Sequence, residues 1–485
     1  QFNPIRCEAS SVLSATFSEY NLGSMSMGIG CILITVVCLT GVAMNSSRAI
    51  FNNRDIGNWK TIQIFSWIGI VLLAIVMFAS SYVEEEHQFW YFWTQTMWVI
   101  WLHDSLKNNI DKKSFIFCIG QMLLVRLIRT WNQTGQKYAG LIDLKYYLNS
   151  SYAPAMWFMV FIVIIGLFLI TLKEIWNLAN VRSHKILIML QCLASLLVLL
   201  TTVLIVEYKL DMDGGRAVMP AFCLPFSRFA GLYLKPFAVA RLAYAALLCL
   251  VGVAIVTDII YNKALTSAQK GQTTLPTILL CSVTYLVILL ARPHNVILFA
   301  LFAMQMKLWI LWQQKILSSE SPSPKFANHF TLIVLEHMSF FALGNSNSLA
   351  SIDISHAYTG VNRYDEVTVG LLTFIANWAG PIWWAFAGIV IHNQVFNVDK
   401  IASKEKDSIR NNLFGRTLLE YLFDSTLFYS IVLLSLSIAV TILKTHLFIW
   451  TVFSPKYLYQ MIWNVLFHFF VEVCGGVLVN MLLMK

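Results

Sequence analysis

The sequence predicts an all-α protein, a polytopic transmembrane bundle of about 12–13 spans. Hydrophobic residues make up 58% of the 485 residues and charged residues 12%, about half the charged share of a soluble domain. The apolar runs are continuous and about 20 residues long, as spanning helices require, whereas a β-barrel would show alternating strands of about ten residues. The 16 Trp, 18 Tyr and 33 Phe suit lipid-facing surfaces and interfacial aromatic belts.

Polar and basic loops separate the apolar stretches and so define the predicted spans. The third span begins in an aromatic anchor, Phe89–Trp93, and the eighth stops at a tight proline turn, Arg292-Pro293. We expect spans at residues 25–44, 61–80, 89 onward, 114–128, 153–172, 186–206, 238–261, 274–291, 296–313, 327–343, 367–392, 427–443 and 457–483.

Two regions follow from this pattern: a polar juxtamembrane segment, 1–24, and a multi-span transmembrane domain, 25–485. The chain starts at Gln1 without a methionine, and no signal peptide precedes the first span. We therefore expect that an N-terminal portion has been removed or left out.

The basic residues predict the orientation. Loops after the odd-numbered spans up to the eleventh mostly carry Lys or Arg, whereas loops after spans two, four, six and ten hold acidic and uncharged polar motifs. By the positive-inside rule the first set is cytosolic, and the second set, with residue 1, faces the lumen or exterior. Glycosylation sequons at Asn132 and Asn149 lie on that side. Among nine scattered cysteines, a disulfide between Cys7 and Cys223 is possible.

The polar motifs collect at the non-cytosolic ends of the spans. A stretch from Glu336 to Tyr364 leaves an apolar helix through an uncharged loop, Gly344–Ser348. Its Asn and Ser side chains suit a sugar or a lipid headgroup, or they simply make a turn between two spans. Arg126 and Arg129 suit forked binding of a phosphate, or they snorkel toward headgroups.

An acidic cluster ahead of the third span suits an ammonium group or a metal, or else caps a solvated loop. The candidates for positioning a substrate or lipid are Glu84, Glu85, Glu86, His87, Arg126, Arg129, Trp131, Asn132, Gln133, Lys137, Arg292, His294, Asn345 and Asn347.

Ionisable residues also lie inside predicted spans, where charges are costly and often functional. They are Lys307, Glu336, His337, His468 and Glu472. We favour a structural pairing of Lys307 with Glu336 or Glu472. No HExxH, GxSxG or P-loop motif occurs, and no His/Asp cluster has metal-ligand spacing, so we predict neither catalytic nor metal-binding residues here.

Four segments together resemble one family: SSYVEEEHQFWYFW (80–93), RLIRTWNQTGQK (126–137), SFFALGNSNSLASIDIS (339–355) and HLFIWTVFSPKYLYQ (446–460). They resemble the membrane region of the glycosylphosphatidylinositol (GPI) ethanolamine-phosphate transferases, most closely the type that modifies the second mannose. The resemblance implies an endoplasmic-reticulum enzyme that moves phosphoethanolamine from phosphatidylethanolamine to a mannose of the GPI precursor.

The resemblance also implies a luminal α/β alkaline-phosphatase-like domain with two zinc ions, which is not in this chain, and a small hydrophobic subunit that stabilises the enzyme. The polar motifs then become candidates for docking that domain or for guiding lipids. The rival interpretations are a lipid transporter or scramblase and a non-catalytic scaffold. No internal repeat is visible, and the polar motifs lie at the interface rather than the midplane where transporters bind substrate. No nucleic-acid partner is expected.

Overall fold

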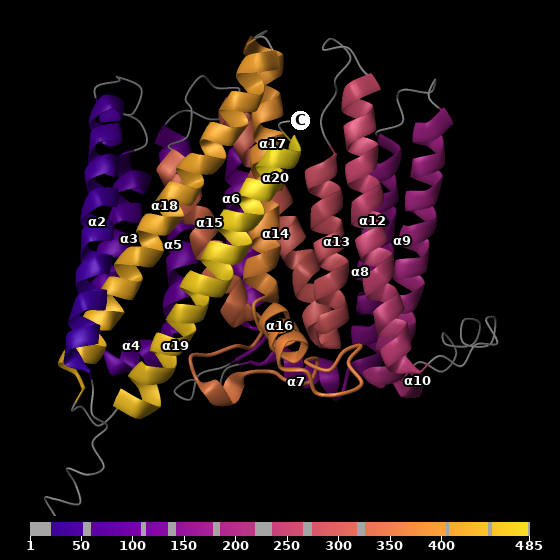
Figure 1. Ribbon diagram of the computed structural model, residues 1–485, viewed down its shortest axis with the longest axis horizontal. Helices are drawn as coiled ribbons and strands as arrows, with labels where there is room; N and C mark the ends of the chain where they lie inside the picture. Colours follow the sequence, from indigo (N-terminus) through magenta and orange to yellow (C-terminus); the bar gives the residue numbers. More distant parts are fainter. Residues whose placement is uncertain are drawn as a thin grey trace, which may run out of the picture.

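A computed structural model describes residues 21–51, 60–107, 113–133, 142–177, 185–218, 235–264, 274–317, 325–403, 407–444 and 449–483. Figure 1 shows its helices running side by side. The regular secondary-structure elements within these ranges are all helices, as the sequence predicts.

The first half of the chain supplies the long helices α2, α3, α5, α6, α8 and α9 and the short helices α4, α7 and α10. Their bounds are α2 (Leu22–Phe51), α3 (Lys60–Val76), α4 (Ser80–Glu84), α5 (Glu86–Lys107), α6 (Lys113–Arg129), α7 (Leu144–Asn149), α8 (Ala153–Asn177), α9 (Lys185–Met212) and α10 (Gly215–Val218).

The second half continues with helices that include one 3-10 turn, η3, and two π-helical segments, η4 and η5. Their bounds are α12 (Pro236–Ala264), α13 (Leu275–Leu290), α14 (Pro293–Leu317), α15 (Lys325–Ala342), η3 (Leu349–Ser351), α16 (Glu366–Asn377), α17 (Ala379–Ser403), α18 (Asp407–Ile442), η4 (Ile449–Phe453), α19 (Ser454–Ile462), η5 (Trp463–Cys474) and α20 (Gly475–Leu483).

A helix or helix pair lies at each of the thirteen predicted spans. Seven of the described helices are long and apolar enough to cross a membrane, or eight if one bent pair counts as a single span. The remaining stretches are shorter, such as α13, or more polar, such as α5 with its Glu86 and Asp104. The protein is therefore a multi-pass membrane protein, and twelve to thirteen crossings stay a prediction.

The predicted continuous span 367–392 is wrong in detail, because α16 and α17 meet at a bend of 70°. Pro381 lacks the N–H that would bond the Asn377 carbonyl one turn earlier. The side-chain amide of Asn345 donates to that carbonyl instead, at 2.7 Å. The bend turns α16 across the end of the bundle (Figure 1).

Burial separates central from peripheral helices. None of the Gly23–Val42 segment of α2 is buried, whereas 61% of the apolar window of α14 is buried inside the bundle. Aromatic side chains fill the interior between α5 and α14, where Trp98 packs edge-on against Trp309 and Trp101 against Trp312. Large aromatic residues bury much area each, so this seam holds the centre of the bundle.

Polar connections gather at one end of the bundle. Figure 1 shows α4, α7, α10 and α16 together at its lower end, with the loop from Leu343 to Asp365 running among them. The predicted gathering of the polar motifs on one face is therefore confirmed. That this face is luminal stays a prediction.

Candidate functional site

The candidate site is a layer of polar contacts at the end of the bundle that carries α4, α7, α10 and α16. We call it the polar layer. It comprises residues 84–88, 129–132, 292–295, 343–365, Asn377 and Lys456. Its parts come from the start of α5, the end of α6, the turn between α13 and α14, the loop between α15 and α16, and α19. Much of this set coincides with the motifs singled out in the sequence.

The first anchor of the polar layer is a buried ion pair between Glu86 and Lys456. The Lys456 Nζ lies 2.6 Å from Glu86 Oε2, and the side chains are 3% and 1% exposed. Trp90 Nε1 donates to the other carboxylate oxygen at 2.9 Å, and Asn347 Nδ2 donates to Oε2 at 2.7 Å. A buried charge needs such a full set of partners. Glu86 is thus a structural anchor that fixes the loop after α15.

Asn345 and Asn347 face the protein rather than the surroundings. Asn345 Nδ2 donates to the carbonyls of Phe340 and Asn377, at 3.0 and 2.7 Å. Asn347 Nδ2 donates to the Val83 carbonyl at 2.9 Å as well as to Glu86. Both amide groups therefore have their donors occupied, and the loop gains its shape from them.

Asn132 forms the second anchor, between α6, α14 and α15. Its Nδ2 donates to Asn295 Oδ1 at 2.9 Å and to the Ala342 carbonyl at 2.7 Å. Asn295 Nδ2 in turn donates to the Leu343 carbonyl at 3.0 Å. Asn132 is 3% exposed, so the nitrogen that would carry a glycan is buried and hydrogen-bonded. The other sequon residue, Asn149, is exposed and contacts His294 Nδ1 at 3.3 Å.

The middle of the loop is held by Arg292, which pairs with Asp353 at 2.7 Å. Burial alone would raise the pKa of Asp353, but hydrogen bonds from Arg292 and Ser355, with the Arg292 charge, lower it to about 2. The Asp353 backbone also exchanges two hydrogen bonds of 3.0 Å with the side chain of Asn377. The turn before α14 is thereby joined to the loop and to the bend after α16.

His356 lies buried in the same loop. Burial lowers its pKa, the charges of Lys209 and Arg292 lower it further, and Asp213 and Asp353 oppose them, which leaves it at about 4. The side chain is therefore neutral at pH 7. A neutral buried imidazole packs here without a counter-charge.

The remaining predicted residues near α5 and α6 have separate environments. Glu85 pairs with His87 at 3.7 Å, and Arg129 donates to Gln88 Oε1 at 2.7 Å. Arg126 is exposed and has no ionic partner among the residues that the structure describes. A shared grip of Arg126 and Arg129 on a phosphate stays a prediction, with Arg126 the more available cation.

Other predicted residues fall into three groups. Trp131 Nε1 donates to the His294 carbonyl at 3.0 Å, and Gln133 Nε2 donates to the Arg129 carbonyl at 2.9 Å. Glu84 is exposed at the end of α4. Lys137, Cys7 and Cys223, with the segment 1–20, lie outside the described residues.

The pairing of Lys307 with Glu336 or Glu472 is wrong. Lys307 is exposed on α14, whereas both glutamates are buried and accept from one hydroxyl, that of Tyr421. Glu472 also contacts His468 Nδ1 at 2.5 Å. These groups link α15, α18 and η5 inside the bundle, where hydrogen-bonded partners lower the cost of polar groups.

His337 is a packed core histidine. Its ring stacks on Trp463 with centroids 4.2 Å apart and on Trp90 at 4.4 Å, and Nδ1 contacts the Ile333 carbonyl at 2.9 Å. Aromatic neighbours on both faces leave the ring no approach for a ligand.

Several residues that build the polar layer escaped the sequence analysis, above all Lys456, Asp353 and Asn377. Lys456 lies in the SPK motif at the start of α19. The local sequence signal for this residue is a lysine directly after a proline at a helix start. Nothing local identifies Glu86 as its partner, because the two residues lie far apart in the chain.

No three His, Cys, Asp or Glu side chains among the described residues are placed to hold a metal ion. In the polar layer, Glu86 is already bonded to three side chains and His87 lies against Glu85 and Gln88. The residues described here therefore do not fit the two zinc ions that the resemblance implies.

In the part of the chain that the structure describes, the regular elements are all helices, and seven or eight of them are long and apolar enough to cross a membrane. Together with the polar layer at one end, they define the class of the protein as a multi-pass membrane region. Residues 17–485 match the family described as the GPI ethanolamine phosphate transferase membrane region, and the chain belongs to this family. No solved structure matches the chain.

The relatives include three fungal proteins that each bear the name GPI ethanolamine phosphate transferase 2. The chain is 31% identical to the Yarrowia lipolytica protein over 96% of the chain and 53% of that protein. It is 27% identical to the Aspergillus oryzae protein (97% and 47%) and 28% identical to the Aspergillus fumigatus protein (96% and 46%). The chain thus spans about half the length of these relatives, and their names support the type 2 assignment.

Proposed function

We propose that this chain is the membrane region of an enzyme that transfers phosphoethanolamine from phosphatidylethanolamine to the second mannose of the GPI precursor. The observation that carries the proposal is the family match over residues 17–485, with relatives named as the type 2 transferase. The enzyme would reside in the endoplasmic-reticulum membrane, with a small hydrophobic subunit as its partner. Its zinc ions would belong to an alkaline-phosphatase-like luminal domain.

In this proposal the polar layer is the platform on which the luminal domain meets the lipid headgroups. One feature of the layer supports that role. Its loop is fixed at Glu86, Asn377 and Arg292, so its surface is held in one conformation. Fixed geometry raises the rate of a reaction between two lipid headgroups and a catalytic centre, because less freedom is lost on reaching the reactive arrangement.

The first test of the proposal is deletion and rescue of the whole gene in its host, with mass spectrometry of the GPI precursors. The expected result is loss, on deletion, of the precursor with phosphoethanolamine on the second mannose, and its return with the intact gene. Unchanged precursors after deletion would overturn the proposed activity.

A second test examines the platform itself. Arg126→Ala should reduce the transfer several-fold at unchanged protein level, because it removes an exposed cation in the last turn of α6, next to the layer, without breaking an ion pair with a described residue. Lys185→Ala is the matched control, since Lys185 is an exposed cation at the opposite end of the bundle, where α9 begins. Normal transfer by Arg126→Ala would show that Arg126 has no role at the platform, and it would not contradict the proposed activity.

A further inference from the structure

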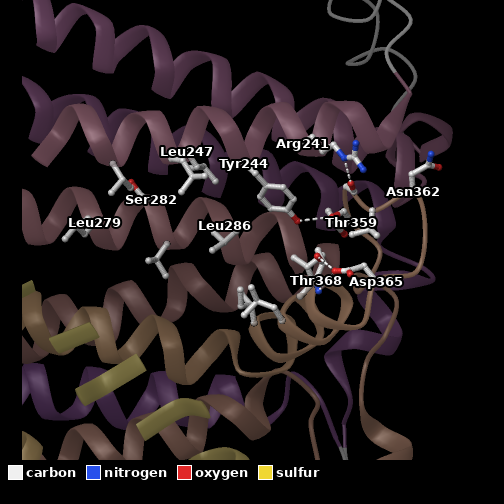
Figure 2. A pocket seen from close by; sticks show the side chains of 18 of the residues that line it. Arg241, Tyr244, Leu247, Leu279, Ser282, Leu286, Thr359, Asn362, Asp365 and Thr368 are labelled. Atoms are coloured by element: carbon white, nitrogen blue, oxygen red, sulfur yellow. Dashed lines mark hydrogen bonds between the residues drawn. The ribbon is translucent and has the colours of Figure 1, made fainter. Parts of the chain in front are cut away.

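A deep apolar groove lies beside the polar layer, between α12, α13, α16 and α17 (Figure 2). Its volume is about 820 Å³, within the range of about 300–1,000 Å³ that pockets for drug-sized ligands occupy. The inner walls are leucine, isoleucine and phenylalanine side chains, among them Leu247, Leu279, Leu286, Ile375 and Phe386. Such walls suit a hydrocarbon chain.

The groove reaches the outer surface of the bundle. Leu248 of α12 and Leu371 of α16 line it and are 74% and 55% exposed. Because both lie on helices of a multi-pass membrane protein, acyl chains of the surrounding lipid have direct access to the groove.

The mouth of the groove is held in a fixed shape by the end of the polar-layer loop. Arg241 Nε donates to the Gly360 carbonyl at 2.7 Å, Tyr244 OH donates to the Thr359 carbonyl at 3.2 Å, and Tyr208 OH donates to Thr359 Oγ1 at 3.1 Å. Gly360 has φ +79°, and an added Cβ would lie 3.0 Å from the Tyr244 ring. The sequence therefore needs glycine at this point of the mouth.

Both signs of charge stand at this mouth. Figure 2 shows Arg241, Asn362 and Asp365 together at one end of the groove, away from Leu279 and Ser282. The Nε of Arg241 is bonded to Gly360, and no described residue accepts from its terminal nitrogens. Arg363 also lines the mouth, is exposed and has no ionic partner among the described residues.

The negative charge comes from Asp365, which caps the start of α16. Its Oδ2 accepts from the backbone N–H of Thr368 at 2.8 Å and from the Thr368 hydroxyl. These hydrogen bonds lower the pKa of Asp365, so the carboxylate is charged at neutral pH. Its Oδ1 accepts from no described residue and is available to a cation.

We propose that this groove binds one zwitterionic glycerophospholipid, with an acyl chain along Leu247 and Leu286, its phosphate at Arg241 and Arg363, and its ammonium group at Asp365. Guanidinium groups bind phosphate oxygens with high directional preference, and a carboxylate next to them selects a headgroup that also carries a positive charge. An anionic lipid would satisfy the arginines and be repelled by Asp365. The inference goes beyond the proposed function, because the groove binds its lipid whether or not transfer follows.

The test is native mass spectrometry of the purified full-length protein after delipidation and addition of one lipid at a time. The probes are palmitoyl-oleoyl phosphatidylethanolamine, the corresponding phosphatidylcholine and the corresponding phosphatidylglycerol. We expect one retained zwitterionic lipid per protein, bound at least fivefold more tightly than phosphatidylglycerol. Equal or tighter retention of phosphatidylglycerol would overturn the assignment of the headgroup.

Two variants test the position of the lipid. Leu286→Trp places a larger side chain in the lining of the groove and should lower retention about tenfold, whereas Leu169→Trp, on the 58% exposed Leu169 of α8, should leave it unchanged. Asp365→Asn keeps a residue that caps helices well and should abolish the preference over phosphatidylglycerol. Retention by Leu286→Trp equal to that of the Leu169→Trp control would overturn the site, and an unchanged preference in Asp365→Asn would overturn the role of the carboxylate.

Discussion

Lys456→Met breaks the buried ion pair with Glu86, and its effect on the free energy of unfolding can be worked out from the structure. The change keeps an apolar stem of similar length but leaves the Glu86 carboxylate buried, with only the Trp90 and Asn347 donors. Breaking a buried ion pair on one side costs about 3–5 kcal/mol of the free energy of unfolding. Loss of this anchor should loosen the loop that carries Asn345 and Asn347.

The size of the loss depends on pH, because the stranded carboxylate can take up a proton instead of staying charged. Protonation costs about 1.4 kcal/mol for each pH unit above the ordinary glutamate value of about 4.3. It therefore limits the loss to about 4 kcal/mol at pH 7 and about 1 kcal/mol at pH 5. The loss should shrink as the pH falls.

The assay is unfolding of the purified protein in mixed micelles at increasing dodecyl sulfate fraction, followed by tryptophan fluorescence at pH 7 and pH 5. Lys325→Met is the matched control, since Lys325 and Glu420 are also 2.6 Å apart but 56% and 33% exposed. An exposed pair contributes about 0–1 kcal/mol. A Lys456→Met variant that loses no more than the control, or loses equally at both pH values, would show that the pair does not anchor the layer.

Three further predictions use the same unfolding assay. His356 has a pKa of about 4 in the folded protein and about 6.5 when unfolded, so the free energy of unfolding should fall by up to about 3 kcal/mol as the pH drops between these values. His356→Gln should make the free energy of unfolding less dependent on pH, and a variant with an equally steep pH dependence would contradict this assignment. Gly360→Ala should lower the free energy of unfolding by about 1–3 kcal/mol because φ is +79°. The control Gly370→Ala, in open space on α16, should be neutral or stabilising, and equal effects of the two substitutions would exclude backbone strain at Gly360. Asn132→Gln should cost about 1–3 kcal/mol for its two hydrogen bonds, whereas Thr134→Ala removes the same sequon and should change neither stability nor gel mobility; a mobility shift would show that Asn132 carries a glycan.

The course of the helices was predictable, because continuous apolar runs have few alternatives in a bilayer. The gathering of polar motifs at one end followed from alternating basic and polar loops, which needs only the positive-inside rule. Pro381 is a sequence signal for the bend at Trp378. The stabilisation of this bend by Asn345 had no such signal, since the contact joins the loop after α15 to the last residue of α16.

The pairing within the polar layer could not be predicted. Glu86 was expected at a surface, yet it is buried with Lys456, and a one-dimensional sequence gives no sign of which distant charge it meets. Lys307 and Glu336 show the converse, because an intramembrane position alone does not bring opposite charges together, and Glu336 contacts Tyr421 instead. Side-chain partners depend on helix rotation and neighbour choice, which apolar periodicity does not set.

The orientation of the polar layer decides whether it can serve luminal headgroup chemistry at all. Tyr364→Cys places a thiol on a 68% exposed position of the loop, and Lys325→Cys places one at the other end of α15. Each variant is treated with an impermeant maleimide in sealed endoplasmic-reticulum vesicles whose cytosolic face is outside, with the unsubstituted protein as background. We predict that Cys at 325 reacts at once and Cys at 364 only after permeabilisation. Reaction at position 364 in sealed vesicles would place the polar layer in the cytosol and contradict its role as a luminal platform.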